Sequence, residues 1–247
     1  MAKLSVIVPA YNAETTLRTA VESILSQQVP GLEIIIVNDG STDATDKICH
    51  ALASENQCIH VITQKNAGIC AARNRGLEAA SGEFLTFCDD DDLLWQGALK
   101  LLLQTAEDTR ADIVRGGYEL LRQRPDGTMV QQPHPAGQAC TIELGSGGYG
   151  AFLTNSGPQF VWNALYRRTA LLGLRFNERC SFGLEDFVFN AAAYRRISKA
   201  VYIRRWSTAI LRARKAPPAR GRPKRCWGAS GRWSHGWSGI SRRPALV

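Results

Sequence analysis

Short apolar segments alternate with helix-like segments through the first 118 residues, and this alternation constrains the fold more than any other feature. The apolar segments, such as residues 4–10 and 32–38, carry β-branched side chains on consecutive positions. That pattern is typical of strands buried on both faces of a sheet. The segments between them place apolar residues at helical spacing, as in residues 17–25. The chain is therefore predicted to form an α/β domain with a doubly wound, mostly parallel sheet.

Polar residues follow each of the first four predicted strands. Because parallel strands point the same way, their carboxyl ends meet at one edge of the sheet, where α/β proteins bind ligands. The sequence therefore predicts a binding site at that edge. The residues placed there are Pro9, Tyr11 and Asn12 after the first strand, Asn38, Asp39, Ser41 and Asp43 after the second, Lys65, Asn66 and Gly68 after the third, and Asp89 to Asp92 after the fourth.

Four consecutive aspartates, residues 89–92, stand between two apolar segments. Adjacent carboxylates repel one another, so either the segment is a strongly charged turn at the start of a helix, or a positive partner lies among these acids. Carboxylate oxygens suit Mg²⁺ or Mn²⁺, and a cation held by one or two carboxylates leaves coordination positions for substrate phosphates. The chain has neither a P-loop nor a dinucleotide-binding glycine motif. Phosphate binding is therefore expected from a metal ion and from cations such as Arg73 and Lys65.

Five segments, taken in order, resemble the inverting family 2 glycosyltransferases, which have the GT-A fold. The segments are VIVPAYN, IIIVNDGSTDAT, NAGICAARNRGL, GEFLTFCDDDD and GLEDF, and the resemblance covers about residues 3–203. The family usually has Asp-Ser-Asp-Asp at its metal-binding motif, and Asp90 here replaces the serine. The resemblance implies a Rossmann-like nucleotide-binding half and a smaller acceptor-side half.

The resemblance also implies which residues bind the nucleotide-sugar donor, expected to be a UDP-sugar. Pro9 and Tyr11 would line the nucleobase pocket, and Asp39 would accept a hydrogen bond from the base. Other side chains would shape the nucleotide site or lie near the ribose. These further donor-site residues are Asn12, Asp43, Asn66, Arg73, Asp89 and Asp90.

The same resemblance assigns a metal site and a general base. Asp91, together with Asp89, would hold Mn²⁺ or Mg²⁺, which offsets the charge of the diphosphate as the glycosidic bond breaks. Direct inversion needs one general base to take the proton of the acceptor hydroxyl. Asp186 matches the family's base, and Glu185 is the second candidate.

The implied reaction is hexosyltransferase-like. It moves a sugar from a nucleotide diphosphate to a hydroxyl group of a glycan or lipid-linked glycan, in the synthesis of a surface polysaccharide. No apolar stretch is long enough to span a membrane, and the N-terminus lacks a signal-peptide pattern. The seven cysteines form no CxxC pair, as expected for thiols in a reducing compartment. These features predict a cytoplasmic enzyme, with peripheral contact at the inner face of the cell membrane as a further expectation.

The chain is expected to divide into a mildly acidic domain and a basic tail. Residues 1–203 would form the glycosyltransferase domain, with the nucleotide-sugar half in 1–118 and the acceptor half in 119–203. Residues 204–247 hold twelve of the 30 Lys and Arg side chains and no Asp or Glu. They show no helical or strand period and are expected to be disordered. The net charge of +8 comes from this tail, so it does not predict a nucleic-acid partner.

Two interpretations of the tail stay open. Its basic and aromatic residues suit docking on anionic lipid. Alternatively, the tail is translated in a shifted reading frame, because GC-rich codons for RRWSTAILRARKA, read two nucleotides later, can give PVVYRYPARPES, which resembles the family's usual continuation. A chain damaged in this way would be a donor-binding remnant with little transfer activity.

Simpler structural roles are also open for several candidate residues. Asp39 would cap the helix that follows it, Glu185-Asp186 would be ordinary first-turn acids, and Arg73 would pair with a surface acid. Trp162-Asn163 is expected to pack within the acceptor half and not to touch sugar. Nucleotidyl transfer is a second enzyme class, but it normally has a glycine-rich, lysine-bearing loop after the first strand, which VPAYNAETT lacks.

Overall fold

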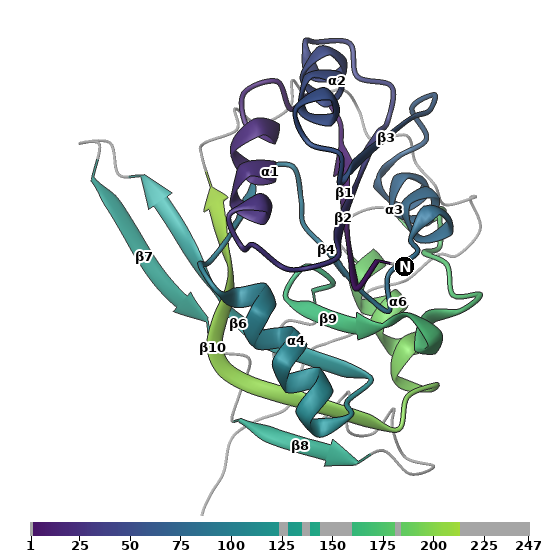
Figure 1. The fold of residues 1–247 in the computed structure, drawn as a ribbon, viewed down its shortest axis with the longest axis vertical. Coiled ribbons are helices and arrows are strands. Elements are labelled where there is room, and N and C mark those ends of the chain that lie inside the picture. The colour runs from purple at the N-terminus through teal and green to yellow at the C-terminus, as the bar shows by residue number, and fades with distance from the viewer. Residues whose placement is uncertain (1, 124–127, 135–138, 144–159, 181–183, 213–247) are drawn as a thin grey trace, which may run out of the picture. The chain divides into compact units, whose positions relative to one another are not determined.

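The computed structural model describes residues 2–123, 128–134, 139–143, 160–180 and 184–212. Their ten strands form one sheet in the order β3-β2-β1-β4-β9-β6-β10-β5, with β7 paired to β6 and β8 paired to β10 (Figure 1). The strands are β1 (Leu4–Ala10), β2 (Leu32–Asn38), β3 (Ile59–Thr63), β4 (Phe84–Phe87), β5 (Asp92–Leu94), β6 (Ile113–Gln123), β7 (Met129–His134), β8 (Cys140–Glu143), β9 (Ala164–Arg167) and β10 (Lys199–Arg212).

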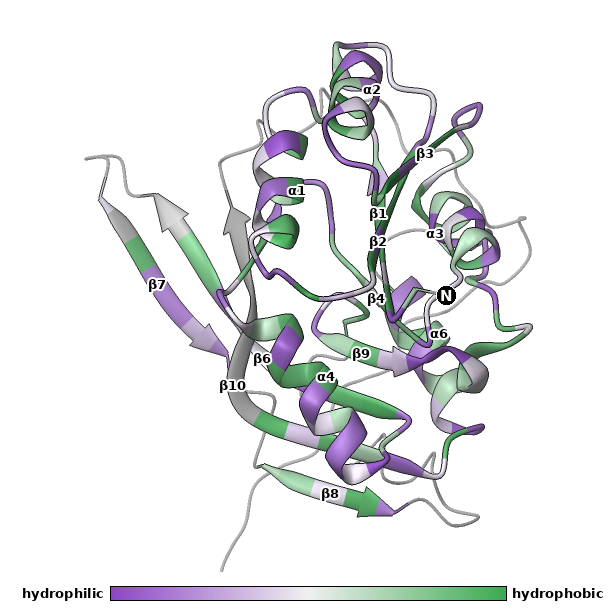
Figure 2. Ribbon diagram, viewed as in Figure 1, coloured by the Kyte–Doolittle hydropathy of each residue, from purple (hydrophilic) through white to green (hydrophobic). Residues whose placement is uncertain are grey.

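The first four strands form the parallel half of the sheet. β1 lies between β2 and β4, β3 pairs with β2, and all three pairings are parallel, as the alternation predicts. Every residue of β1 is buried. Its side chains alternate between the two faces, because Val6 and Val8 belong to one apolar cluster and Ile7 belongs to the other. Figure 2 accordingly shows β1 and β2 as hydrophobic.

Helices cover both faces of this sheet (Figure 1). On one face, α1, α2 and α4 pack through side chains such as Val21, Leu52 and Leu102. On the other face, α3 and α6 pack through Ala72 and Phe189. The sheet is therefore doubly wound. The helices are α1 (Leu17–Leu25), α2 (Thr45–Glu55), α3 (Ile69–Ala79), α4 (Ala98–Thr109) and α6 (Glu185–Tyr194), with one 3-10 turn, η1 (Arg168–Leu171).

The second half of the chain extends the same sheet. β9 pairs antiparallel with both β4 and β6, and β10 pairs parallel with β6. The acceptor half is thus continuous with the nucleotide half, and contacts group residues 1–213 into one compact unit. β6 also pairs antiparallel with β7, and the two strands form a hairpin. The turn that joins them, residues 124–127, lies outside the described residues.

Three predicted boundaries are wrong. The helical pattern of residues 93–109 predicts a helix from Leu93, but residues 92–94 form β5, which pairs with β10, and the helix begins at Ala98. The boundary expected at 118 falls inside β6. Residues 204–212, expected to begin a disordered tail, continue β10, because their backbone pairs with β6 and β5. The rest of that tail, 213–247, and the glycine-rich segment 144–159 lie outside the described residues.

Within the described residues, no helix combines the length and the apolar character that crossing a bilayer requires.

Candidate active site

The carboxyl ends of β1 and β4 are tied together at the edge of the sheet. The backbone N–H of Tyr11, just after β1, donates to Asp90 Oδ2 at 3.1 Å. Tyr11 is 49% exposed, so its ring is accessible there. Pro9 lies inside β1 and is buried, opposite Val37 of β2. The structure therefore brings the first strand end to the acidic segment, with Tyr11 as its accessible residue.

Asp39 is buried and accepts three hydrogen bonds from the loop after β3. Its Oδ1 accepts from Gln64 Nε2 at 2.8 Å and from the Ala67 N–H at 2.9 Å, and its Oδ2 accepts from the Gly68 N–H at 2.8 Å. Gly68 immediately precedes α3, so Asp39 caps α3 and not the helix that follows Asp39 in sequence. A carboxylate has about four lone-pair positions, which leaves one for a ligand donor.

Asn12 and Asp43 hold the loops around this edge. Asn12 has a left-handed backbone, with φ 51°, and its side-chain oxygen accepts from the Thr42 N–H at 2.8 Å. Asp43 accepts from the Thr45 N–H at 3.0 Å, at the start of α2, and from the Glu14 N–H at 3.2 Å. Both carboxylate oxygens of Asp43 are thus hydrogen bonded within the protein. These contacts favour a role in shaping the site over direct donor contact.

The loops after β2 and β3 approach each other closely at Gly40. Gly40 has φ 68°, in the region that favours glycine. A Cβ atom on Gly40 would lie 2.6 Å from the backbone nitrogen of Asn66. Any side chain at position 40 would therefore push the two loops apart. Asn66 is exposed beside this contact, at the predicted edge.

The four aspartates have four different surroundings. Asp89 Oδ1 accepts from Arg73 Nη2 at 3.0 Å, and Asp90 accepts the backbone hydrogen bond already described. Asp91 is partly exposed. Asp92 begins β5 and is buried. Burial, followed by repulsion from the other three carboxylates, raises the pKa of Asp92 well above its ordinary value. The expected repulsion is thus relieved by Arg73 and by the weaker acidity of Asp92.

Arg73 links the acidic segment to helix α6. Its side chain is 2% exposed, and its Nη1 donates to Asp186 Oδ1 at 2.6 Å while its Nη2 donates to Asp89. Glu185 Oε1 lies 4.0 Å from the same Nη1. Burial opposes the charge on Arg73, but Asp89 and Asp186 outweigh burial and raise its pKa. The alternative in which Arg73 pairs with a surface acid is wrong, because its partners are predicted site acids.

Asp186 and Glu185 form the first turn of α6. Asp186 is buried, and its Oδ2 accepts from the Val161 N–H at 3.1 Å. Burial raises the pKa of Asp186, while Arg73 and the Val161 N–H act in the opposite direction. Glu185 Oε2 is buried and has no hydrogen-bond partner in the described part of the chain. The turn therefore holds the Asp186 carboxylate in a fixed orientation, whereas Glu185 Oε2 is left to bind another group.

A buried polar network supports Asp186, and the sequence analysis missed it. Arg115 of β6 donates to Asn163 Oδ1 at 2.6 Å and to Asn190 Oδ1 of α6 at 2.9 Å. It thereby ties the segment that contains Val161 to the helix that carries Asp186. A signal was present, because Arg115 directly follows the apolar residues Ile113 and Val114 in a predicted strand, and a charge in a buried strand requires polar partners.

Trp162 packs within the acceptor half, as expected. Its ring stacks on Phe160 with centroids 4.5 Å apart and meets Tyr118 edge-on at 5.0 Å. The side-chain amide of Asn163 donates to the Gly116 carbonyl at 3.0 Å. These residues form a packed wall beside Val161.

The acidic segment fits a cation only in part. In the described ranges, no group of three or more His, Cys, Asp or Glu is arranged to hold a metal ion. Asp89 and Asp91 supply two partly exposed carboxylates at one turn, and oxygen ligands suit Mg²⁺ and Mn²⁺. The donor set therefore fits a cation that takes its remaining ligands from a diphosphate, and does not fit a cation held by the protein alone.

The part of the chain that carries the edge site matches a known family. The family model described as Glycosyl transferase family 2 matches residues 5–172, more than half of the chain. The chain belongs to glycosyl transferase family 2. The family match includes the whole parallel half of the sheet and the acidic segment after β4. The fold and family implied by the sequence resemblance are therefore confirmed.

Relatives of this family 2 chain come from several bacteria. It is 36% identical over 172 residues to EpsH of Bacillus subtilis (strain 168), named as a glycosyltransferase, which covers 68% of this chain and 48% of EpsH. It is 42% identical over 115 residues to a Campylobacter jejuni subsp. jejuni serotype O:2 protein named GalNAc(5)-diNAcBac-PP-undecaprenol beta-1,3-glucosyltransferase, covering 46% of this chain and 37% of that protein. The chain thus spans about half or less of the length of these relatives.

Solved structures show the same architecture. S. aureus TarS 1-349, in complex with UDP, aligns with a TM-score of 0.70 and 24% identity, covering 85% of this chain and 60% of that chain. This likeness supports the GT-A fold.

Proposed function

We propose that this chain is a metal-dependent, inverting glycosyltransferase that moves a hexose from a UDP-sugar to a hydroxyl group of a glycan or lipid-linked glycan, in surface polysaccharide synthesis. The observation that carries the proposal is the double contact of Arg73, which joins Asp89 on the donor side to Asp186, the proposed base. Asp89 at the donor edge and Asp186 on α6 thus share the buried Arg73 guanidinium. This shared contact holds the donor side and the acceptor side of the proposed site together.

Two comparisons support the choice of substrates. TarS has been solved with UDP and with UDP-GlcNAc, which supports a UDP-sugar donor. The name of the Campylobacter relative contains an undecaprenol-linked glycan, which supports a lipid-linked acceptor. In this chain, the accessible ring of Tyr11 and the remaining lone pair of Asp39 suit a nucleobase, while Asn12, Asn66 and Asp43 shape the surrounding loops.

The proposed chemistry is a single displacement at the anomeric carbon. The acceptor oxygen forms a bond to C1 as the bond between C1 and the phosphate oxygen breaks, and UDP leaves with the electron pair. The acceptor proton passes to a carboxylate oxygen of Asp186. Arg73 and the Val161 N–H occupy two of its lone-pair positions, so about two remain for this proton. Burial raises the pKa of Asp186, which makes it a stronger base, and Arg73 acts in the opposite direction by favouring the ionised form.

Asp91, with Asp89, would hold a Mn²⁺ or Mg²⁺ ion. When bound, such an ion offsets the charge of the diphosphate leaving group. The protein's own contribution is geometric, because Arg73 fixes Asp89 relative to Asp186 before substrates arrive.

We place the reaction in the cytoplasm, with peripheral contact at the inner face of the membrane and no nucleic-acid partner. A lipid-linked acceptor requires the active site to work close to a bilayer. The basic residues of 204–247 are compatible with that location.

The proposal is tested by incubating the full chain with a panel of UDP-sugars, Mn²⁺ and lipid-linked glycan acceptors. Mass spectrometry should show consumption of one donor with UDP release and a matching increase in acceptor mass. Proton NMR of the product should show an anomeric configuration opposite to that of the donor. Donor binding or hydrolysis without transfer to any acceptor would favour the damaged-remnant interpretation, and neither binding nor consumption of any UDP-sugar would contradict both.

A further inference from the structure

Helix α6 has apolar residues on two faces, and only one face packs on the sheet. Phe189 is buried in the core. Leu184, Val188, Ala191 and Arg195 recur at spacings of four, three and four residues, so they form one stripe on the other side. Leu184 is 62% exposed and Val188 is 40% exposed. Because contiguous apolar side chains exposed on a protein surface usually mark a contact site, this stripe is expected to have a partner.

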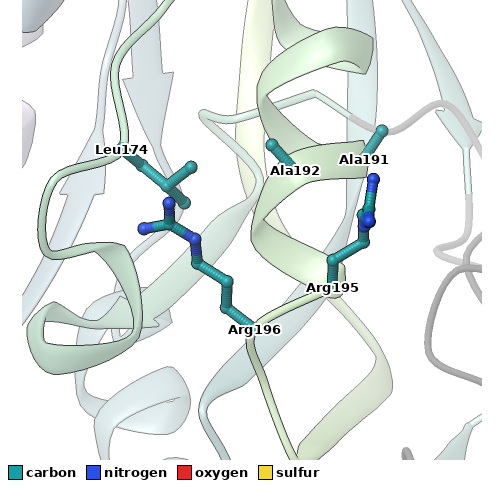
Figure 3. Close-up of a pocket in the computed structure, with 5 residues that line it drawn as sticks. All are labelled: Leu174, Ala191, Ala192, Arg195 and Arg196. Carbon is teal, nitrogen blue, oxygen red and sulfur yellow. The ribbon is translucent and has the colours of Figure 1, made fainter. Parts of the chain in front are cut away.

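Another exposed apolar residue, Leu172, lies beside the C-terminal end of α6. Leu172 is 60% exposed, and its carbonyl accepts from Arg196 Nη1 at 2.8 Å. Between this turn and the helix is a hollow of about 840 Å³. Figure 3 shows Arg196 reaching toward Leu174 and Arg195 running back along the helix beside Ala191. Among the residues that the structure describes, Leu174, Ala191, Ala192, Arg195 and Arg196 line the hollow.

The two arginines at this hollow carry unbalanced positive charge. Both are exposed, and neither Arg195 nor Arg196 forms an ion pair with any carboxylate among the residues that the structure describes. Leu172, in contrast, is held in its exposed position by the Arg196 hydrogen bond. The surface thus combines exposed leucine and valine side chains with uncompensated guanidinium groups.

We propose that this surface docks on a bilayer that contains anionic lipids. Apolar side chains of such a surface enter the boundary between headgroups and acyl chains, while arginines contact lipid phosphates. An anionic bilayer satisfies both features, whereas an uncharged apolar partner would bury the arginines without counter-charges. We name it the outer α6 face, and its residues are Leu172, Leu184, Val188, Arg195 and Arg196.

Docking through the outer α6 face would bring the proposed base close to the bilayer, and this part of the inference rests on the proposed function. The face belongs to the same helix as Asp186. Along the helix axis, Asp186 and Arg195 are about 14 Å apart. A protein docked through this face would therefore hold its proposed base within a few sugar lengths of the bilayer surface, where a lipid-linked glycan is anchored.

The test is sedimentation of the full chain with phosphatidylglycerol vesicles and with phosphatidylcholine vesicles, without donor. We expect R195E/R196E to bind phosphatidylglycerol vesicles at least about tenfold more weakly than wild type. The matched control is K47E/K100E, which makes the same charge change on the exposed surfaces of α2 and α4 and should bind like wild type. Wild type should bind phosphatidylcholine vesicles weakly.

Further variants separate charge from folding and from other partners. R195E alone leaves the Arg196 hydrogen bond in place and should still weaken binding, and L172S/V188S should weaken it with the charge unchanged. Wild-type binding by R195E/R196E would overturn the inference and assign vesicle binding to another segment. Altered self-association of R195E/R196E in light scattering, with vesicle binding unchanged, would assign the face to a second copy. UDP titration of the same proteins reports separately on the proposed function.

Discussion

Arg73 donates hydrogen bonds to Asp89 on the donor side of the site and to Asp186 on α6, and each contact affects what the carboxylate can do. Asp89 gives one oxygen to Arg73 and has the other available for a ligand. Asp186 gains a fixed orientation, and the cation offsets part of the pKa rise that burial causes. At the residue scale, one buried guanidinium therefore couples the donor-side acid to the proposed base.

Replacing Asp186 with Asn should abolish sugar transfer but preserve donor binding. The amide keeps the size of the side chain but cannot accept the acceptor's proton, so turnover should fall on the order of 10²-fold or more. The affinity for UDP, measured by calorimetry, should change by no more than about threefold. E185Q is the matched variant. Near-normal turnover of D186N together with an inactive E185Q would move the base to Glu185.

Glu33 is a buried carboxylate away from the site. It accepts hydrogen bonds from the Ser5 hydroxyl, from the backbone and hydroxyl of Ser81, and from the Gly82 N–H. These bonds join β1 and β2 to the turn that precedes β4. Burial alone would raise the pKa of Glu33, but the hydrogen bonds outweigh burial and lower it below the ordinary value of 4.5. Folding is therefore favoured by the ionised form of Glu33.

The substitution E33Q should destabilise the fold in a pH-dependent way. At about pH 7 the loss in free energy of unfolding should be about 2 kcal/mol, because an amide group would face donors that need an acceptor. Since the folded pKa of Glu33 lies below its unfolded value, its contribution is complete above the unfolded pKa and is lost as pH falls through the folded pKa. Urea unfolding should show the gap between wild type and E33Q narrowing on acidification. A gap that widens on acidification would contradict this assignment.

At the scale of elements, the parallel half of the sheet was predictable, but the pairing partners of the later strands were not. The strands β1 to β4 are apolar, follow one another in sequence with one helix between successive strands, and occupy adjacent places in the sheet in the order β3-β2-β1-β4. β9 pairs with β4 from 80 residues away in sequence, and nothing local in ALYR specifies that partner. Likewise β10 gains its strand conformation by pairing with β6 and β5. The composition of residues 204–212 therefore did not predict that the strand continues there.

The site shows the same division. The sequence predicts that Tyr11 and Asp90 lie at one edge of the sheet even when the strand order is unknown, because the carboxyl ends of parallel strands all meet at that edge. The bridge from Arg73 to Asp186 joins α3 to α6 across 113 residues. It depends on how two helices pack on one face, and a linear pattern does not contain that information.

The extension of β10 to Arg212 predicts a pattern of proteolysis. Trypsin should leave the bonds after Arg204 and Arg205 intact in the native chain, because cleavage requires local unfolding and both residues lie inside β10, between Tyr202 and Trp206, which pair with β6. The urea-unfolded chain is the control, and it should be cut at both bonds. Rapid native cleavage after Arg204 or Arg205, read by mass spectrometry, would restore the tail boundary expected at 204.

At the scale of the whole molecule, the compact unit of residues 1–213 contains both the donor edge and α6. The family match ends at residue 172, before Glu185 and Asp186. The donor side therefore has support from family and geometry together, whereas the acceptor side depends on the contacts of α6. The chain also spans only 48% of EpsH, so the acceptor's identity is a question for experiments with the full set of substrates.

The most direct test of this account is calorimetric titration of the full chain with UDP, in Mn²⁺ and again with a chelator. The account predicts at least about tenfold weaker binding without the metal, about 1.4 kcal/mol. D91N should show the same loss in the presence of Mn²⁺, while D108N, the same chemical change on the exposed surface of α4, should bind like wild type. Equal affinity of the wild type for UDP with metal and with chelator would contradict the account.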